Sequence, residues 1–535
     1  MSIQVQDLNH LGIVAGIIDE MGLVEVIDRQ IAPHPQPTVS TGVALKAMIL
    51  NGLGFISAPL YLFEQFFVGK ATEHLLGAGI TAKHLNDDRL GRALDAVWEA
   101  GLSGLFMTIA MQAYERFGVS AQSVHLDSSS FSVTGAYPAT DADADGLVPL
   151  KITYGYSKDH RPDLKQFLVD VICSNDGEVP LFLRVGDGNE SDSAVFGQLI
   201  AEFQQQWTLD SVYVADAALY TEANLKTLGD LQWVTRVPLT LKAARQLVDE
   251  LAVEAFVPST LEGYTCLERT SDYGGVAQRW VVVCSEPRRQ SDLKQLEKQL
   301  NKQAKKAEKQ LRQLQQQTFA CAADAQQAAQ RLAQKWPLHQ LSAVTVEPQA
   351  HYDQVGRPAR GQAPSHYSFQ LQAEVVPCPE AIALAQRRAG RFILATNVLA
   401  ANHFTASQVL STYKDQQAPE RGFRFLKDPL FFTSSVFLNT PSRVAALAFV
   451  MGLALMVYTL AQRQLRQALA AQDETIPNQL GKPTAKPTLR WVFMCFQAVH
   501  WLQVEQLPQI SNLTDIRVKI LGFFGAPCQK YYLLC

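Results

Sequence analysis

Residues 211–237 read SVYVADAALYTEANLKTLGDLQWVTRV, and this stretch decides the fold class. The β-branched and aromatic run from Ser211 to Ala215 predicts a buried strand that stops at an acidic residue, Asp216. Thr221 is a good N-cap for a short helix, and residues 233–237 are a second strand-like run. A strand, a helix and a strand in succession indicate a sheet with flanking helices, the arrangement of α/β proteins.

Three further strands are predicted before this stretch. Residues 124–126 form a short apolar run that leads into Asp127, and residues 167–173 form a second run. The turn sequence SNDG at 174–177 connects that run to a third, residues 179–185, as in a β-hairpin. Two adjacent antiparallel strands followed by the strand–helix–strand unit predict a mixed sheet.

The sheet pattern resumes late in the chain, where residues 391–396 (RFILAT) predict another strand. A helix begins after Thr405, because this residue and Gln408 have the spacing of a capping box. The helix is predicted to run through Tyr413 towards Glu420. Pro419 stands immediately before Glu420, so we expect the helix to bend or restart there.

The composition is that of a soluble globular protein. Hydrophobic residues make up 47% of the chain and charged residues 18%. The length of 535 residues is enough for two to four domains with at least one large core. The eight cysteines show no C-x-x-C pair, which argues against a zinc ribbon and against a disulfide framework. The first residues, MSIQVQDLNHLG, lack the order of a secretion signal. We therefore expect a cytoplasmic protein with reduced thiols.

Charge is spread unevenly along the chain. The formal charge is −5 over residues 1–117, −10 over 118–240, +4 over 241–390 and +7 over 391–535, which gives the total of −4. A protein that binds nucleic acid usually has a more basic total. The total therefore counts mildly against such a role, and the basic second half favours it.

Residues 444–461 (VAALAFVMGLALMVYTLA) are apolar enough to raise the question of a membrane span. The segment is rich in alanine, no second segment resembles it, and arginines border both ends, so the charges give no orientation. We predict a buried core helix and no membrane association.

Helical spacing dominates residues 1–117, and a different pattern interrupts the sheet at residues 241–390. In the interruption, leucines and alanines recur at intervals of three and four from Leu293 to Leu314, and an Ala/Gln-rich helix follows at about 320–335. This spacing predicts a helical hairpin. Its first arm carries Lys298, Lys302, Lys305, Lys306 and Lys309. That arm either lies along DNA or presents an ordinary solvated face.

Three acidic residues stand where a metal site needs them: Asp127 and Asp216 at strand ends, and Glu420 on a helix. Carboxylates at neighbouring strand ends converge on one point, and a facing helix adds the third. Such oxygen ligands suit Mg²⁺ or Mn²⁺. The acidic turn at Asp187, Glu190 and Asp192 is more typical of a loop after a strand.

Two sequence runs resemble motifs of the DDE transposases of bacterial insertion sequences. The run YVADAALYT, residues 213–221, is similar to the second-aspartate motif, in which an Asp is followed by a small residue at the second position and a Tyr two further on. The run YKDQQAPERGFRFLK, residues 413–427, resembles the signature called YREK. Tyr413, Glu420 and Lys427 fit its spacing, whereas Gln416 stands at its Arg position.

Two further segments strengthen the resemblance. His125-Leu126-Asp127 fits the first-aspartate strand, and residues 155–166 (GYSKDHRPDLKQ) resemble the segment before the second strand in a subgroup of the family. The resemblance covers residues 120–240 and 390–430 and the order of the motifs along the chain.

The resemblance implies an RNase H-like mixed sheet core in an α/β protein. The domains expected on this basis are a helical N-terminal DNA-binding domain (1–117), the first part of the catalytic core (118–240), an α+β insertion domain with a helical hairpin (241–390), the second part of the core (391–470) and a helical C-terminal region (471–535).

The implied activity is metal-dependent cleavage of the ends of an insertion sequence and their transfer to target DNA. Asp127, Asp216 and Glu420 would be the catalytic residues and would bind two Mg²⁺ ions, with Mn²⁺ able to replace them. The implied partners are double-stranded DNA with terminal inverted repeats, target DNA and a second copy of the chain in a synaptic complex. A bacterial protein of this kind is associated with the nucleoid when bound to DNA.

DNA contacts are expected from residues near these motifs. The full set is Tyr413, Gln416, Arg421, Arg424, Lys427, Lys158, Arg161 and Lys165. Gln416 cannot supply the fixed positive charge of the family's arginine, and Arg421 or Arg424 are candidates to replace it. Two rival interpretations stay open: a catalytically inactive descendant that binds DNA or regulates, and a membrane-associated protein built around residues 444–461.

Overall fold

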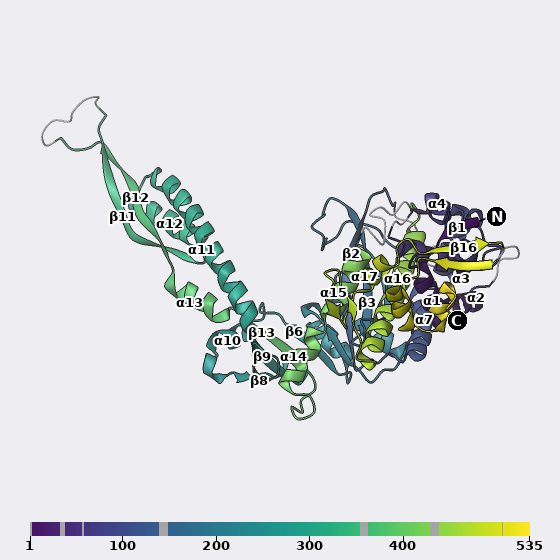
Figure 1. Ribbon diagram of the computed structural model, residues 1–535. Coiled ribbons are helices and arrows are strands. Elements are labelled where there is room, and N and C mark those ends of the chain that lie inside the picture. The colour runs from purple at the N-terminus through teal and green to yellow at the C-terminus, as the bar shows by residue number, and fades with distance from the viewer. Residues whose placement is uncertain are drawn as a thin grey trace.

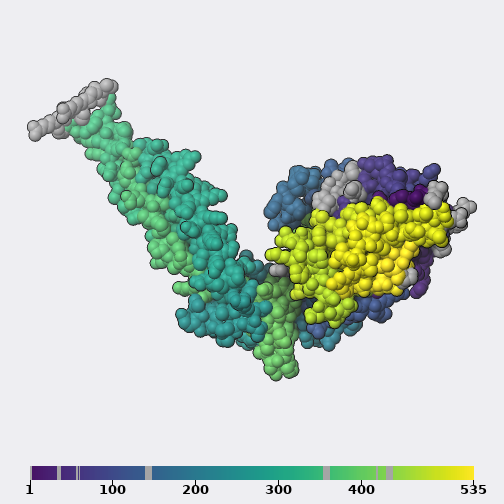
Figure 2. Space-filling view, in the orientation of Figure 1, coloured from purple at the N-terminus to yellow at the C-terminus, as the bar shows by residue number. Residues whose placement is uncertain are grey.

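The computed structural model describes residues 3–32, 38–55, 58–138, 148–353, 362–428, 438–505 and 507–534. It consists of a body, which contains both termini, and a long arm that projects from one end of the body (Figure 1). In the space-filling view the arm stands away from the body, with an open notch between the two (Figure 2).

A nine-stranded sheet runs through the body, in the order β4-β3-β2-β5-β6-β13-β9-β8-β7. Its strands are β2 (Ser123–Val133), β3 (Lys165–Ser174), β4 (Pro180–Gly186), β5 (Val212–Ala215), β6 (Trp233–Val237), β7 (Val257–Pro258), β8 (Tyr264–Ser271), β9 (Gln278–Ser285) and β13 (Arg391–Thr396). Strand β2 pairs with β3 in antiparallel and with β5 in parallel orientation, and β5 and β6 are also parallel. The antiparallel β2–β4 meander joined in parallel to β5 and β6 confirms the RNase H-like mixed sheet.

Strand β2 is longer than predicted. The serines after Asp127 are poor strand formers, but residues 123–133 pair along their whole length with β3, from Val124 opposite Ser174 to Val133 opposite Lys165. Asp127 therefore lies inside β2 and does not end it. What ends before Asp127 is only the parallel pairing, whose last pair is Leu126 with Ala215.

The helices of the body lie before, between and after the strands of the sheet. They are α1 (Leu11–Met21), α2 (Leu23–Gln30), α3 (Thr41–Gly52), α4 (Phe63–Phe67), α5 (Thr72–Leu76), α6 (Asp87–Glu99), α7 (Leu102–Phe117), α8 (Asp192–Gln206), α9 (Glu222–Leu228), α10 (Lys242–Glu250), α14 (Ala406–Lys414), α15 (Gln417–Leu426), α16 (Pro441–Ala471), α17 (Leu489–Cys495), α18 (Asp515–Gly522) and α19 (Ala526–Gln529). The caps predicted at Thr221 and Thr405 are present, the latter as a capping box with Gln408.

The N-terminal helices are not packed as a separate unit. Helix α7 lies on β4, α1 contacts α16 and α19, and one hydrophobic core runs through all of them. The C-terminal region is not wholly helical, because β16 (His500–Val504) and β17 (Leu507–Ser511) form a hairpin that pairs with β1 (Ile3–Asp7). A small ladder joins β14 (Ile476–Pro477) to β15 (Pro483–Thr484). The two ends of the chain are thus tied to each other.

Helix α16 contains the apolar run at 444–461, and it is the one helix among the described residues that is long and apolar enough to cross a membrane. It packs against α1, α3, α6, α7 and β4, and 83% of its most apolar window is buried inside the protein. Its apolar residues serve the core of the body, as predicted.

The arm is smaller than the predicted insertion at 241–390. Residues 257–285 form β7, β8 and β9, which extend the central sheet because β9 pairs with β13. The arm itself consists of α11 (Glu286–Gln315), β10 (Thr318–Phe319), α12 (Ala322–Ala333), β11 (His339–His351), β12 (His366–Pro377) and α13 (Pro379–Arg388).

The predicted helical hairpin exists, but its seam packs differently. Helix α11 lies mainly against strand β12, and Ala307 and Leu311 share a small core with Trp336 and Leu371. A β-hairpin supplies the apolar surface that the coiled-coil pattern led us to expect from α12 alone.

Basic residues form a stripe along the exposed side of α11. We call this set the α11 stripe: Lys294, Lys298, Lys302, Lys305, Lys309 and Arg312. The intervals of four, four, three, four and three residues place them on one face of the helix, and all six are exposed. Eighteen residues of helix are about 27 Å long. Among the described residues, no carboxylate forms an ion pair with the stripe.

Candidate active site

Asp127 and Asp216 lie side by side on neighbouring parallel strands. The last parallel pair of β2 and β5 is Leu126 with Ala215, and the two aspartates are the next residue on each strand. Partners in register point to the same face of a sheet, and neighbouring strands are about 4.8 Å apart. The register of β2 and β5 therefore makes two of the three acids singled out from the sequence neighbours.

Burial and mutual repulsion change the acidity of both groups. Burial, opposed by Lys158 and assisted by Asp216, raises the pKa of Asp127 to about 7. Burial also raises the pKa of Asp216, and Asp192 adds to the effect. Two carboxylates that resist ionisation this strongly form a place where a cation is favoured.

Lys158 and Asp192 complete the charge pattern around the two aspartates. The Lys158 ammonium donates to Asp192 Oδ2 at 2.8 Å and to the carbonyl oxygen of Ser128 on β2. From the sequence, Asp192 was interpreted as part of a turn after a strand, and Lys158 was predicted to contact DNA. The signal available for Asp192 was its place at the first residue of α8, where the start of a helix favours an acid.

Backbone contacts fix the position of Asp216. Its Oδ1 accepts a hydrogen bond from the amide of Ala218 at 2.8 Å, and its carbonyl accepts one from Thr235 Oγ1 at 2.6 Å. Tyr220, four residues on, is buried and its hydroxyl donates to Gln278 Oε1 at 2.7 Å. The tyrosine of the second-aspartate motif thus ties this turn to strand β9.

Gln416 attaches the glutamate-bearing helix to strand β2. Its Nε2 donates to the carbonyl of Leu126 at 2.8 Å, and its Oε1 accepts from His125 Nδ1 at 3.3 Å. The side chain is 7% exposed. Both ends of the amide bind the strand residues that precede Asp127, so Gln416 positions the helix and its side chain is not presented to DNA.

Glu420 is exposed at the start of α15, one helical turn after Gln416. The helix is interrupted as Pro419 predicted, because α14 ends at Lys414 and α15 begins at Gln417. Positions four apart lie on the same face of a helix, about 6 Å apart. Gln416 contacts the carbonyl immediately before Asp127, so α15 begins next to strand β2.

Tyr413, near the end of α14, is half-buried against an apolar cluster. Burial raises its pKa to about 12; Arg236 opposes this rise, and Asp216 and Glu420 both add to it. One hydroxyl therefore senses the second aspartate and the glutamate together. Arg236, on β6, was not singled out from the sequence, and only its place in the strand after Asp216 pointed to it.

Within the described ranges, no group of three or more His, Cys, Asp or Glu residues is already arranged to hold a metal ion. The donors present still fit a divalent cation, because Asp127 and Asp216 offer half-buried carboxylate oxygens whose pKa values are raised. Glu420 is exposed and has no ion-pair partner among the described residues, so its side chain is available as a third oxygen ligand.

The remaining predicted DNA contacts occupy different surroundings. Arg421 pairs with Glu178, whereas Lys427 donates to both carboxylate oxygens of Asp159 at 2.8 and 2.9 Å. Arg161 forms an exposed fork with Asp163, and Lys165 bonds the carbonyls of Ala136 and Tyr137. Arg424 is exposed, and no bond joins it to another described residue.

Comparison with known proteins gives two family matches. The family described as transposase DDE domain matches residues 122–459, which contain Asp127, Asp216 and Glu420. A domain of unknown function, DUF4277, matches residues 3–111. None of the curated proteins compared with the chain matches it.

Among solved structures, the chain is similar to a piggyBac transposase in a synaptic complex with hairpin DNA. The similarity covers 93% of this chain and 83% of that chain, with 9% sequence identity and a TM-score of 0.39. A similarity of this size carries no argument about the site.

Proposed function

The chain belongs to the transposase DDE domain family, and from this premise we propose that it cuts the ends of an insertion sequence and joins them to target DNA. The observation that carries the proposal is the register of β2 and β5, which makes Asp127 and Asp216 neighbours on one face of the sheet. Glu420, held one turn from the anchor at Gln416, is the third acid.

In this proposal the three acids hold two Mg²⁺ ions, and Mn²⁺ can replace them. When bound, the ions supply an activated attacking oxygen and stabilise the leaving oxygen of the phosphodiester. Lys158 restrains the aspartate side of the site through its bonds to β2 and Asp192. Tyr413, with its hydroxyl protonated at neutral pH, would donate a hydrogen bond to a DNA phosphate.

The DNA would lie across the body and along the arm. The α11 stripe supports this proposal, because six cations at helical spacing match a line of phosphates over about 27 Å, or roughly eight base pairs. Arg424, Arg161 and Lys427 are further DNA contacts in this proposal. A DNA phosphate would replace Asp163 as the partner of Arg161 and Asp159 as the partner of Lys427. Two copies of the chain would hold the inverted-repeat ends of the element in one complex. The reaction would take place in the bacterial cytoplasm.

The test uses a plasmid that carries the gene with its own flanking DNA, incubated with the purified chain and Mg²⁺. We expect breaks at the two borders of the element, and none with Glu420→Gln or in EDTA. Glu99→Gln, an exposed acid on α6, is the matched control and should cut normally. Border-specific binding without Mg²⁺-dependent breaks would instead identify an inactive descendant that binds DNA.

A further inference from the structure

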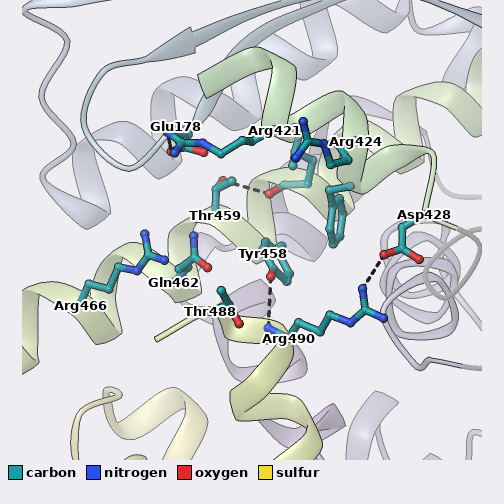
Figure 3. Close-up of a pocket in the computed structure, with 13 residues that line it drawn as sticks. Glu178, Arg421, Arg424, Asp428, Tyr458, Thr459, Gln462, Arg466, Thr488 and Arg490 are labelled. Carbon is teal, nitrogen blue, oxygen red and sulfur yellow. Dashed lines mark hydrogen bonds and ion pairs between the residues drawn. The ribbon is translucent and has the colours of Figure 1, made fainter. Parts of the chain in front are cut away.

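A cavity of about 310 Å³ lies against helix α15 (Figure 3). Its walls come from the β3–β4 turn, α15, α16 and the start of α17. The charged residues that line it are Glu178, Arg421, Arg424, Asp428, Arg466 and Arg490. Arg424 comes four residues after Glu420 on α15, so this lining residue and the proposed third acid lie on the same side of one helix.

Positive charge prevails in the cavity. Two of the four guanidinium groups have carboxylate partners, Arg421 with Glu178 and Arg490 with Asp428, the latter at 2.8 Å (Figure 3). Arg424 and Arg466 have no ion-pair partner within the described part of the chain. The formal charge of the lining is therefore +2.

The donor groups of these two arginines are largely unused. Arg466 is half-buried, and among described residues only its Nε donates, to the carbonyl of Pro487 at 3.0 Å. Arg463, three residues earlier on α16, shows what a structural arginine looks like here. It is 7% exposed, and its two terminal nitrogens bond two carbonyls and Asp176. An arginine has five N–H donors, so Arg466 keeps four for a ligand.

We propose that this cavity binds a phosphate group. Guanidinium groups bind phosphate through paired hydrogen bonds. Two guanidiniums of the cavity already bind carboxylates, those of Glu178 and Asp428, and a carboxylate carries less negative charge than a phosphate. Phenylalanine and tyrosine rings, Phe425 and Tyr458 with centroids 4.4 Å apart, form an apolar wall beside the charges. The volume of about 310 Å³ leaves room for a sugar beside the phosphate.

The phosphate belongs either to a DNA backbone that passes Glu420 or to a small free phosphate compound. The same guanidiniums recognise both, so two probes separate the sources. Inorganic phosphate is titrated against chloride at equal ionic strength, with the melting temperature as the readout. A fluorescein-labelled 20-base-pair duplex is titrated by fluorescence anisotropy.

The protein for both titrations is the full chain with Asp216→Asn, in EDTA. No metal is bound and no DNA is cut, so a failure of the proposed catalysis cannot imitate the result. Four variants are compared in this background: Arg424→Gln, Arg466→Gln, Glu178→Gln and, as the control, Lys486→Gln, which is exposed and outside the cavity lining.

We expect Arg424→Gln and Arg466→Gln each to weaken phosphate binding roughly 10-fold, the usual effect of losing a charge-assisted contact. Glu178→Gln frees Arg421 and should tighten binding several-fold, which loss of structure would not do. Lys486→Gln should change nothing.

An equal loss of duplex affinity in the arginine variants assigns the phosphate to DNA, and an unchanged duplex affinity assigns it to a small compound. The proposal is overturned if both arginine variants bind phosphate like the parent, or if Glu178→Gln weakens binding. Arg424 is exposed and forms no bond to another described residue, so its variant tests the site without risk to folding.

Discussion

Of the two aspartates, Asp127 has the more strongly raised pKa, and its surroundings explain the rise. The side chain is held inside strand β2 by neighbours on both sides, with Asp216 next to it. Its carboxylate accepts only a bond from the amide of Ser128, at 2.8 Å, among described residues. Lys158 offsets part of the cost of ionising this half-buried carboxylate, but the raised pKa shows that the anion still destabilises the fold unless a further cation joins it.

This cost predicts a pH-dependent effect of Asp127→Asn in EDTA. The pKa rises from 3.8 to about 7 on folding, so the folded chain binds a proton that the unfolded chain has lost. Stability therefore falls as the pH rises from about 4 to 7, and the loss is complete above 7. We expect the variant to melt a few degrees above the parent at pH 8, for a gain on the order of 2 kcal/mol.

At pH 5 the two proteins should differ little, and Mg²⁺ at pH 8 should raise the melting temperature of the parent alone. Calorimetry at both pH values checks this. A variant that melts below the parent at pH 8 would contradict the account of Asp127.

Gln416 makes a second residue-scale prediction. Its amide bonds Leu126 and His125, so Gln416→Leu keeps the volume but leaves that carbonyl without its partner. A lost buried bond costs about 1–3 kcal/mol. We expect slower Mg²⁺-dependent cutting, because Glu420 is no longer fixed beside β2, with DNA affinity unchanged. Reduced affinity with normal cutting would show that Gln416 contacts DNA instead.

At the scale of elements, helix α11 separates its two faces cleanly. Ala307 and Leu311 are buried against the arm, and the α11 stripe lies on the opposite, solvent side. The pattern of charges could be predicted from the sequence. Which side faces solvent followed only from the structure, because β12 and not a second helix covers the apolar seam.

The stripe predicts how DNA affinity depends on salt. Replacing Lys298, Lys302 and Lys305 by Gln removes three cations, so the slope of log K against log salt should become shallower by about 3. The matched control replaces three exposed lysines elsewhere: Lys226, Lys242 and Lys482. Filter binding with a duplex at several salt concentrations checks this. Equal slopes for the two triple variants would exclude the stripe as a DNA contact.

Some elements could be predicted from the sequence and others could not. Strands β6 and β13 match their predicted bounds because both are short runs in which every residue but Arg236 is buried. The extension of β2 through Ser128 to Ser130 depends on pairing with β3, a long-range contact that overrides local preference. Likewise, the hairpin β16–β17 forms because β1, from the other end of the chain, pairs with it.

The site shows the same division. The adjacency of Asp127 and Asp216 was predictable from two strands that each run into an acid. The parts played by Asp192 and Arg236 were not, since each acts through space on groups distant in the sequence.

At the scale of the whole molecule, the arm is inserted between two strands that are direct neighbours. Strand β9 ends at Ser285 and β13 begins at Arg391, and Cys284 pairs with Arg391. The amide of Ser285 donates to the carbonyl of Gly390 at 2.9 Å, as at the closed end of a hairpin. The body therefore needs only a tight turn where the arm now stands.

We predict that replacing residues 286–389 by Asn-Gly, the preferred two-residue turn, leaves a folded body. The loss of the Arg388–Asp249 ion pair should lower the melting temperature by only a few degrees. Affinity for DNA should fall at least 10-fold, since the α11 stripe is removed. Circular dichroism and anisotropy measure the two effects, and an aggregated or unfolded product would show that the arm stabilises the body.

The convergence of Asp127, Asp216 and Glu420 on one metal site is tested most directly by iron-directed cleavage of the protein chain. Fe²⁺ replaces Mg²⁺, and ascorbate with peroxide then generates radicals that cut the backbone near the bound ion. We predict cuts around residues 127, 216 and 420, all suppressed by excess Mg²⁺ and absent from Asp127→Asn. Mg²⁺-sensitive cuts that spare the segment around residue 420 would contradict the account.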